Sequence, residues 1–459
     1  MHIQVSKLSK SFGGQDVLKD VSFAINSGEK VALLGKNGSG KSTLFKILMG
    51  EETPDSGYVT FNPKTVQIGY LPQVADDNDP LSSGQKLKKR FREILISKPD
   101  VLLLDEPTNH LDWQGMTWLE KEVMAFTDPV LIVSHDRYFL DRIVDKILEL
   151  ENGEVKVYGG NYSLYKQQKQ IELESHLRNY EKQQKQIQKL QADLLEKRNT
   201  VQKSGSDVPP TRDKDKFAAS FFANRVGRKF GKQIQALENR IESIEKIDKP
   251  EANWELKALF KPKQESNQTV VQIKSVNYKD ILNEVSLIIQ KGERLALIGD
   301  NGSGKTTLIK LILGQLTPDD GEINIGNGVQ IGYLSQEHQE LDSDKIVLDE
   351  LASENIDKTE SYKLLRRFLL PPEKINQPVK FLSSGEKAKL LLAKIMTSEA
   401  NFIILDEPTN HLDIQSRQAI EEALANYPGT LLVISHDRYF LDKIGITDSI
   451  EMGKFKLKI

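Results

Sequence analysis

An internal repeat constrains the fold of this chain more than any other feature. The stretch VALLGKNGSGKSTLFKILMG (31–50) matches LALIGDNGSGKTTLIKLILG (295–314), and four further pairs follow in the same order. These pairs are QIGYLPQ and QIGYLSQ, LSSGQ and LSSGE, LLLDEPTNHLD and IILDEPTNHLD, and SHDRYFLD in both places. Repetition of this extent predicts two homologous domains. We place them at residues 1–160 and 268–459, with a linker at 161–267.

The two copies differ in length at one point. The offset between matching residues is 263 at Gln73 and Gln336, and it becomes 301 at Leu81 and Leu382. The first copy therefore lacks 38 residues between its glutamine and LSSGQ. We expect the first domain to lack most of a helical region that the second domain contains, and the two domains to work unequally.

Each copy contains a phosphate-binding loop. GKNGSGKS (35–42) and GDNGSGKT (299–306) fit the pattern G-x-x-x-x-G-K-[ST], and each follows an apolar strand and opens a helical pattern. The glycines of such a loop let backbone N–H groups approach phosphates, and the helix N-terminus adds positive potential. Two loops in this context predict an α/β fold with two ATP sites. The residues expected at the nucleotides are Gly35, Asn37, Gly38, Gly40, Lys41, Ser42 and Thr43 in the first copy and Gly299, Asn301, Gly302, Gly304, Lys305, Thr306 and Thr307 in the second.

Polar residues that follow apolar strands complete each site. We expect Lys41 and Lys305 to reach the phosphates, and Ser42 and Thr306 to ligate Mg²⁺. An apolar strand in each copy ends in Asp-Glu, where the first acid suits a Mg²⁺ contact and the second suits polarising the attacking water. A histidine after a strand is more often structural, but its identical placement in both copies favours contact with the γ-phosphate. The metal candidates are Asp105 and Asp406, and the catalytic candidates are Glu106, Glu407, His135 and His436.

The segment between the copies follows a different pattern. Apolar residues in 173–194 and 230–244 recur at alternating spacings of four and three, which is typical of a coiled-coil seam. SGSDVPPTRD (204–213) is not expected to continue a helix, because of its glycine and prolines. The pattern predicts an antiparallel helical hairpin with its tip near 200–225. Arms of about 30 residues would each span about 45 Å.

The hairpin is basic although the whole chain is not. Residues 182–232 hold thirteen Lys and Arg against five Asp and Glu, whereas the net charge of the chain is -3. A basic segment with interleaved aromatics favours RNA binding, although a solvated coiled-coil face is also a common place for charge runs. Phe222, Val226 and Phe230 extend the seam and are expected to be core. The candidates for RNA contact near the tip are Lys214, Lys216, Phe217, Phe221, Asn224, Arg225, Arg228 and Lys229.

Composition excludes several kinds of site. The chain has no cysteine, so it has no disulfide, cysteine zinc site or iron–sulfur cluster, which fits a cytoplasmic location. No apolar run approaches 18 residues, so we expect no transmembrane helix and no membrane as a partner. The first residues, MHIQVSKLSK, lack the pattern of a secretory signal.

Taken together, the motifs resemble the ATP-binding cassette family, and the resemblance covers both repeated domains. It implies a head-to-tail sandwich within one monomer, in which each ATP lies between the phosphate loop of one copy and the LSSGQ or LSSGE signature of the other. Gln73 and Gln336 would add a Mg²⁺ contact in this arrangement. The signature residues implied at the nucleotides are Ser82, Ser83, Gly84 and Gln85 in the first copy and Ser383, Ser384, Gly385 and Glu386 in the second, and the adenine-stacking aromatics are Phe12 and Tyr278.

Two cassettes joined by a basic helical hairpin, with DEPTNHLD in both, resemble the ABC-F class. The resemblance implies an ATPase that binds ATP and Mg²⁺ and associates with the ribosome at the exit-tRNA site. There the hairpin would reach rRNA and tRNA near the peptidyl-transferase centre, and no DNA would be bound. Such a protein would be a translation factor or an antibiotic-resistance protein. Two alternatives remain open, a cassette scaffold that binds another protein and the ATPase subunit of a transporter with a separate membrane chain.

Overall fold

The computed structural model describes residues 2–73, 83–109, 111–206, 231–244, 267–335, 340–352, 356–368, 370–410 and 412–452. The chain divides into two compact units. Met1–Tyr165 and Trp254–Ile459 form one unit, which contains both repeat copies, and Lys166–Asn253 form the other. The prediction of an α/β fold with tandem cassettes and a helical linker is confirmed.

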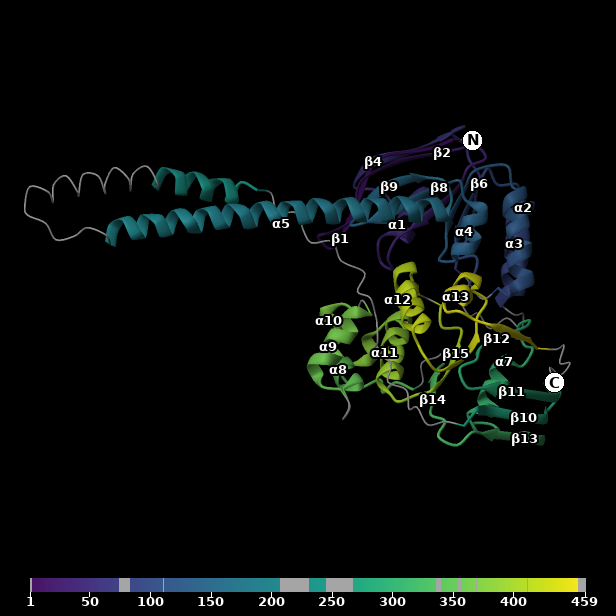
Figure 1. Ribbon diagram of the computed structural model, residues 1–459. Coiled ribbons are helices and arrows are strands. Elements are labelled where there is room, and N and C mark those ends of the chain that lie inside the picture. The colour runs from purple at the N-terminus through teal and green to yellow at the C-terminus, as the bar shows by residue number, and fades with distance from the viewer. Residues whose placement is uncertain are drawn as a thin grey trace, which may run out of the picture. The chain divides into compact units, whose positions relative to one another are not determined.

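The first copy is built on two sheets (Figure 1). The antiparallel sheet has the order β2-β1-β4, and the larger sheet has the order β5-β6-β7-β3-β8-β9, parallel except for β9. Strands β3, β6 and β7 are continuous apolar runs, as expected where a parallel sheet is covered on both faces. The elements are β1 (His2–Phe12), β2 (Gln15–Asn26), β3 (Lys30–Leu34), α1 (Lys41–Met49), β4 (Ser56–Asn62), β5 (Ile68–Leu71), α2 (Ser83–Ile96), β6 (Val101–Asp105), α3 (Trp113–Ala125), β7 (Val130–Val133), α4 (Arg137–Ile143), β8 (Lys146–Glu151) and β9 (Glu154–Gly159).

The second copy repeats this plan. Its antiparallel sheet has the order β11-β10-β13, and its parallel sheet has the order β14-β15-β16-β12-β17. The elements are β10 (Thr269–Tyr278), β11 (Leu282–Gln290), β12 (Arg294–Ile298), α7 (Lys305–Ile312), β13 (Asp320–Ile325), β14 (Ile331–Leu334), α8 (Val347–Leu351), α9 (Lys358–Arg367), α10 (Pro372–Ile375), the 3-10 helix η1 (Val379–Phe381), α11 (Ser384–Thr397), β15 (Phe402–Asp406), α12 (Ile414–Ala425), β16 (Thr430–Ile434), α13 (Arg438–Lys443) and β17 (Asp448–Glu451).

The length difference between the copies falls on helices. Between β14 and α11 the second copy carries α8, α9, α10 and η1, and their apolar residues, such as Leu364 and Leu365, join the same core as residues of α11 and α12. Between β5 and β6 the described residues of the first copy carry α2 alone. The expectation that the first copy lacks most of this helical region stays a prediction, because residues 74–82 lie outside the described residues.

The sheet order explains where the site forms. In the first copy β6, β7 and β3 are neighbours and parallel, so their carboxyl ends meet at one edge. The phosphate loop follows β3, Glu106 follows β6, and His135 stands two residues after β7. The neighbours β15, β16 and β12 do the same for the second copy. Residues that lie far apart in the sequence are thus brought to one edge by the topology.

The second unit is helical. Helix α5 (Tyr162–Ser206) has 45 residues, and residues 231–242 are also helical. Arg198 on α5 donates a hydrogen bond to Glu238, which ties the two helical stretches together. The residues of the predicted seams are the less exposed ones, and they are Leu173, Leu177, Tyr180, Gln184, Ile187, Leu190 and Leu194 on α5 and Ile234, Leu237, Ile241 and Ile244 on the return.

Two expectations about the linker need correction. The stop predicted at 204–213 is wrong for its first three residues, because α5 continues through Gly205 to Ser206. A glycine costs a helix about 1 kcal/mol, which a long cooperative helix tolerates, whereas Pro209 and Pro210 lie outside the described residues. The first arm is also longer than about 30 residues, since α5 begins at Tyr162. Of the described helices, none combines the length and apolarity that a membrane span requires.

Candidate active site

The first phosphate loop has the backbone that its glycines permit. Gly40, the residue before α1, has a φ of 105°, in the left-handed region that disfavours other residues. A Cβ at Gly40 would lie 2.7 Å from Cγ1 of Val17, so the close approach of β2 also requires glycine. In the second copy Gly304 has a φ of 90° and precedes α7 in the same way. Both loops therefore turn directly into a helix N-terminus, as phosphate binding requires.

The two loop lysines fold back over their loops. Nζ of Lys41 donates to the carbonyl oxygens of Gly35 at 2.8 Å and Lys36 at 3.0 Å. Lys305 repeats this with Gly299 at 2.7 Å and Asp300 at 2.9 Å. Burial lowers the pKa of both ammonium groups, and nearby carboxylates oppose the shift. Each lysine is thus held over the hollow of its loop as a partly desolvated cation.

Polar groups in both loops have capacity for a ligand. The hydroxyl oxygens of Ser39 and Ser303 are buried and have no hydrogen-bond partner within the described structure. Buried polar atoms are normally paired, so two unpaired hydroxyls at matching positions indicate that a polar ligand completes the loops.

The predicted metal residues form all-oxygen sets. In the second copy Oγ1 of Thr306 donates to Oδ2 of Asp406 at 3.0 Å. In the first copy Ser42, Gln73 and Asp105 line one cavity. Within the described residues no group of three or more His, Cys, Asp or Glu is suited to hold a metal by itself. Hydroxyl and carboxylate oxygens in small number suit Mg²⁺, which is normally bound with substrate phosphates and water.

The glutamates that follow the Asp residues have a constrained backbone. Glu106 and Glu407 have φ values of 49° and 50°, a region that non-glycine residues seldom adopt. Their amide groups donate to Val133 and Ile434 on the neighbouring strands. Strain of this kind concentrates at functional sites, where the surrounding structure maintains it. The identical conformation in both copies supports a shared functional role.

Burial dominates the electrostatics of these glutamates. Desolvation raises the pKa of Glu106 to about 7 and that of Glu407 to about 8. Lys41 and Arg417 oppose this shift at Glu106, and Lys305 opposes it at Glu407. A carboxyl group with a pKa near neutrality is suited to accept a proton at physiological pH.

Each glutamate lies beside the predicted histidine of its own copy. The amide of His135 donates to Oε2 of Glu106 at 3.3 Å, and Nε2 of His135 lies 3.2 Å from Oε1. Nε2 of His436 lies 3.6 Å from Oε1 of Glu407. Burial lowers the pKa of His135 to about 3 and that of His436 to about 4, so both imidazoles are neutral at pH 7 and neither contact is an ion pair.

A cavity of about 550 Å³ joins the two copies at the first loop. Its first-copy lining includes the loop, Gln73, Asp105, Glu106 and His135, and its second-copy lining is Ser383, Ser384, Gly385 and Arg417. This volume suits a nucleotide-sized ligand. The structure therefore brings the loop at 35–42 and the second signature to one cavity, as the resemblance implied.

The signature of the second copy is a capped helix start. Ser383 is the N-cap of α11 and accepts from the amide of Glu386, while the Glu386 carboxylate accepts from the amide of Ser383. This reciprocal capping fixes the orientation of the first turn. In the first copy α2 begins at Ser83, with Gly84 and Gln85 in its first turn. Ser82 lies outside the described residues, as does Gln336 of the second copy.

The predicted adenine-stacking aromatics are placed less distinctively. Phe12 ends β1, is 48% exposed, and lies under Nζ of Lys10 at 5.1 Å. Tyr278 ends β10 and lies under Nζ of Lys279 at the same distance. Val17 rather than Phe12 is among the residues that line the cavity. Stacking by Phe12 and Tyr278 stays a prediction.

The eight candidates for RNA contact lie outside the described residues.

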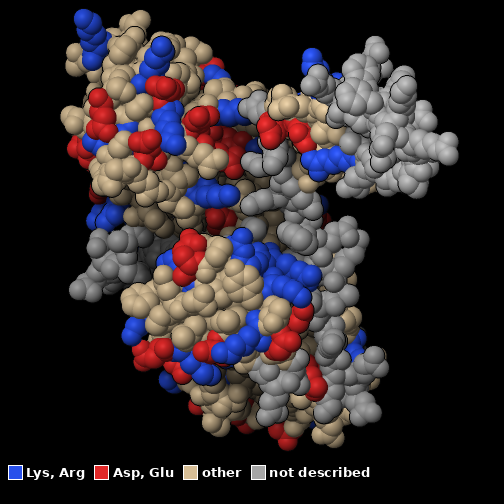
Figure 2. Space-filling model, turned by 90° about the vertical axis from the view of Figure 1, so that its left-hand side faces the viewer, with Lys and Arg blue, Asp and Glu red and all other residues tan. Residues whose placement is uncertain are grey.

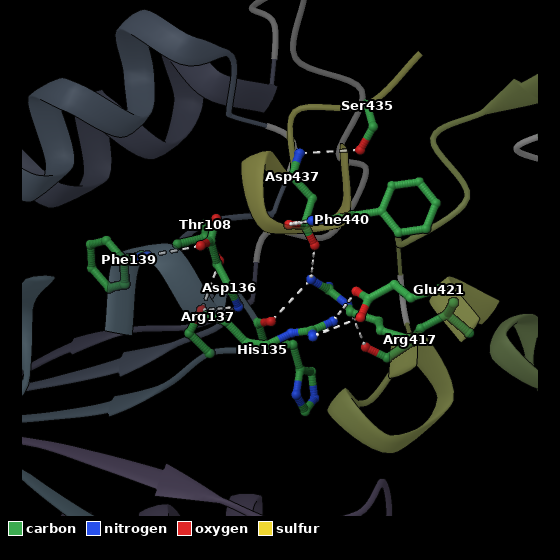
Figure 3. A network of polar contacts seen from close by, with 12 residues as sticks. Thr108, His135, Asp136, Arg137, Phe139, Arg417, Glu421, Ser435, Asp437 and Phe440 are labelled. Carbon is green, nitrogen blue, oxygen red and sulfur yellow. Dashed lines mark hydrogen bonds and ion pairs between the residues drawn. The ribbon is translucent and has the colours of Figure 1, made fainter. Parts of the chain in front are cut away.

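Sequence reasoning missed a buried polar network between the copies (Figure 3). Arg137, the first residue of α4, forms a two-pronged ion pair with Glu421 on α12, and its NH1 lies 3.0 Å from Oε2. Arg417 on the same helix donates to the carbonyl oxygen of His135 and to Oδ2 of Asp437, both at 3.0 Å. Arg137 lies within the repeated SHDRYFLD motif, whereas Arg417 lies outside the repeated motifs. Nothing in the sequence linked either arginine to its partner in the other copy, because the partners lie more than 280 residues away.

Comparisons with known proteins agree with this architecture. The domain family described as ABC transporter matches residues 18–79 and 282–410, and a second family with the same description matches 148–204. The Bacillus subtilis protein YdiF, described as ATP-binding, is 35% identical over 97% of this chain and 79% of its own length. ABC transporter F family member 2 of Arabidopsis thaliana is 32% identical, with coverages of 96% and 75%.

Two further likenesses concern a relative and a fold. The ribosome protection protein VmlR of Bacillus subtilis is 32% identical over 96% of this chain and 85% of its own length. The solved structure of an RNase-L inhibitor superposes with a TM-score of 0.59 over 98% of this chain and 88% of that chain. Its sequence identity is 20%, so this likeness concerns the fold alone.

Proposed function

Because the chain belongs to the F family of ATP-binding cassette ATPases, we propose that it is a ribosome-associated ATPase that hydrolyses ATP at two composite sites. The observation that carries the composite arrangement is the cavity shared by the loop at 35–42 and the signature at 383–385. A nucleotide bound there would contact both copies, so binding would favour their contact and hydrolysis would release it.

We assign roles at the first site from position and charge. Lys41 and the loop amides bind the phosphates, because they form the cationic hollow before α1. Glu106 accepts a proton from the attacking water, and neutral His135 beside it orients the γ-phosphate by hydrogen bonding. The signature turn at Ser384 and Gly385 closes the site from the second copy. Lys305, Glu407 and His436 take the same roles at the second site.

Mg²⁺ is the metal that the oxygen ligands fit. Ser42, Gln73 and Asp105 would hold it at the first site, and Thr306, Gln336 and Asp406 at the second. When bound, the ion would neutralise phosphate charge during phosphoryl transfer. The phosphate loop and the signature turn of the other copy would orient the phosphates and exclude water from them.

The charge distribution supports an RNA partner for the hairpin. Its stretch at 182–232 carries a net charge of +8 in a chain of net charge -3. On the face drawn in Figure 2, basic and acidic side chains of the described residues are interspersed. A positive segment on otherwise mixed surfaces suits binding to phosphate-rich RNA without general adhesion of the cassettes. The similarity to a ribosome protection protein points to the ribosome as the source of that RNA.

The finer proposal concerns where the hairpin acts. We propose that the chain binds near the exit-tRNA site as a monomer in the cytoplasm. Its hairpin tip would approach the peptidyl-transferase centre through rRNA and tRNA contacts at the basic and aromatic residues of 214–229. The effect would be stimulation of translation or protection from an antibiotic.

Co-sedimentation with ribosomes tests the proposal. The double variant Glu106→Gln and Glu407→Gln should bind ATP normally and hydrolyse it about 10²–10⁴-fold more slowly, because each site loses its proton acceptor. With ATP, this variant should pellet with ribosomes. The matched control is Lys41→Ala with Lys305→Ala, which should not be retained because its loops lose their phosphate-binding cations.

The outcomes separate the alternatives. Undiminished turnover in the glutamate variant would contradict the catalytic assignment. Normal ATP binding without retention on ribosomes would contradict the ribosomal partner. That second result would favour a protein-binding scaffold or a transporter subunit with a separate membrane chain.

A further inference from the structure

Arg417 lies where the two cassettes meet, and it is almost fully buried. It stands on α12 of the second cassette and is 5% exposed. Nε donates to the carbonyl oxygen of Leu412 at 3.1 Å, which fixes the guanidinium relative to its own helix. NH1 donates to Asp437 of its own cassette and to the carbonyl oxygen of His135 of the other. The side chain is therefore held in one orientation and aimed across the interface (Figure 3).

The contact reaches the reacting groups of the first site through one residue. Arg417 holds the carbonyl of His135, and the amide of the same residue donates to Oε2 of Glu106 at 3.3 Å. Arg417 also lines the cavity that contains Lys41 and Glu106. A change in the position of α12 would thus move the turn that orients Glu106. The second cassette supplies this restraint only when it contacts the first.

The second site has no matching arginine. From the signature onward the copies are offset by 301 residues, so the position that matches Arg417 is Met116 on α3. Met116 is buried in the apolar core of the first cassette, and its thioether cannot donate a hydrogen bond to the His436 turn. The ion pair between Arg137 and Glu421 also has no counterpart at the matching positions. Arg438, which matches Arg137, stacks on the rings of Trp113 and Tyr138, while buried Glu120, which matches Glu421, pairs with Arg142 at 3.4 Å.

We infer that Arg417 is a positioning residue that the second cassette supplies to the first nucleotide site, where it holds the His135 turn in the orientation that hydrolysis requires. The first cassette supplies no matching residue to the second site, because Met116 occupies that position. Hydrolysis at the first site therefore depends on the position of α12, whereas hydrolysis at the second does not depend on the matching position of α3. This inference rests on the proposed roles of Glu106 and Glu407.

The test compares the two sites in turn. The substitution Arg417→Met installs the residue found at the matching position. It is made in a Glu407→Gln background, where turnover comes from the first site, and in a Glu106→Gln background, where it comes from the second. In the first background kcat should fall roughly 10- to 100-fold, the size expected for a lost hydrogen bond from a charged group. In the second background kcat should fall by a smaller factor, because Arg417 reaches that site only from its own cassette, through Asp437 beside His436. KM for ATP should stay nearly constant in both, because Arg417 acts through His135.

Controls separate positioning from folding. Arg417→Lys keeps the positive charge but not the planar guanidinium that donates to several acceptors at once, so it should recover part of the lost kcat. Arg417→Met with Asp437→Asn avoids leaving an uncompensated carboxylate and keeps an N-cap for α13, so it should show the same difference between sites. Met116→Leu, the matched substitution on α3, should leave both backgrounds unchanged. Melting temperatures are measured for every variant.

Equal loss in both backgrounds would overturn the inference, since a structural role would disturb both sites. No loss in either background would overturn it as well. If neither glutamate substitution slows turnover, the roles of Glu106 and Glu407 fail separately. Lys41→Ala and Lys305→Ala then silence one site each, and the effect of Arg417→Met is compared in those backgrounds by the same criterion.

Discussion

The buried ion pair between Arg137 and Glu421 predicts that Glu421→Gln weakens the contact between the cassettes. Arg137 is 1% exposed and Glu421 is 5% exposed, and the guanidinium meets both carboxylate oxygens. Removing one partner of a buried pair typically costs about 3–5 kcal/mol, because the remaining charge stays desolvated. The ring of Tyr439, 4.5 Å from the guanidinium, retains part of the stabilisation. We therefore expect the lower end of that range, about 3 kcal/mol.

The cost should fall on the contact rather than on the folding of either cassette. The two partners belong to different copies, so separation of the cassettes lets both side chains rehydrate. A loss of about 3 kcal/mol corresponds to roughly a 150-fold shift of the equilibrium from contacting to separated cassettes. The chain has no cysteine, so one introduced in each cassette allows specific labelling with a pair of fluorophores. The populations are then read from the distance distribution in saturating ATP.

A double variant provides the control for this prediction. Arg137→Met with Glu421→Leu replaces the pair by apolar side chains, which is often neutral or stabilising. It should restore the contacting population. The reasoning is refuted if Glu421→Gln leaves the populations unchanged, or if the double variant is as defective as the single one.

Three further predictions follow from other features. Burial and the neighbouring Asp437 raise the pKa of Asp136, so the folded state favours the protonated carboxyl and loses stability as pH rises above the ordinary pKa of the group. The variant Asp136→Asn should therefore have a higher melting temperature than the parent at pH 7 and nearly the same melting temperature at pH 4. An equal effect at both pH values would contradict this reasoning. Asn also keeps the N-cap of α4, where Asp136 accepts from Phe139 at 2.8 Å. Replacing residues 204–225 by a short Gly/Ser turn should leave basal ATPase activity intact and abolish the effect on translation or drug protection; full biological activity would show that the tip is not the effector. Neutralising Arg225, Arg228 and Lys229 should weaken ribosome binding and make the log–log salt slope shallower by about two to three units if all three meet phosphates, and an unchanged slope would exclude those contacts.

Local patterns explain why so much of this protein can be predicted from its sequence. A phosphate loop is a strand, a glycine-rich turn and a helix within about twenty residues, so the backbone at Gly40 and Gly304 follows from the local sequence. Because each motif occurs in both copies, the repeat supported every motif twice and showed where the copies differ in length. The coiled-coil seam was equally readable, because its burial follows a fixed spacing along one helix.

The limits appear where competing local signals meet. Gly205 and its serines were interpreted as a helix stop, yet α5 runs through them, because the small cost of a glycine is shared by a 45-residue helix. Stacking of adenine on Phe12 stays a prediction, and the spacing of the sequence did not indicate that Val17 lines the cavity. The spacing of residues along one strand does not predict which side chains of two neighbouring strands lie closest to a ligand.

Sequence alone determined which residues form the two loops with the phosphate-binding pattern and that the domain carrying them is repeated. Tertiary structure alone decided which atoms of one cassette reach the other. Arg417 and Glu421 lie 282 and 284 residues from their partners His135 and Arg137. No periodicity or motif links positions that far apart, because their contact depends on how two folded surfaces meet. The asymmetry between Arg417 and Met116 is visible in the sequence, but its consequence is defined only once α12 lies against the His135 turn.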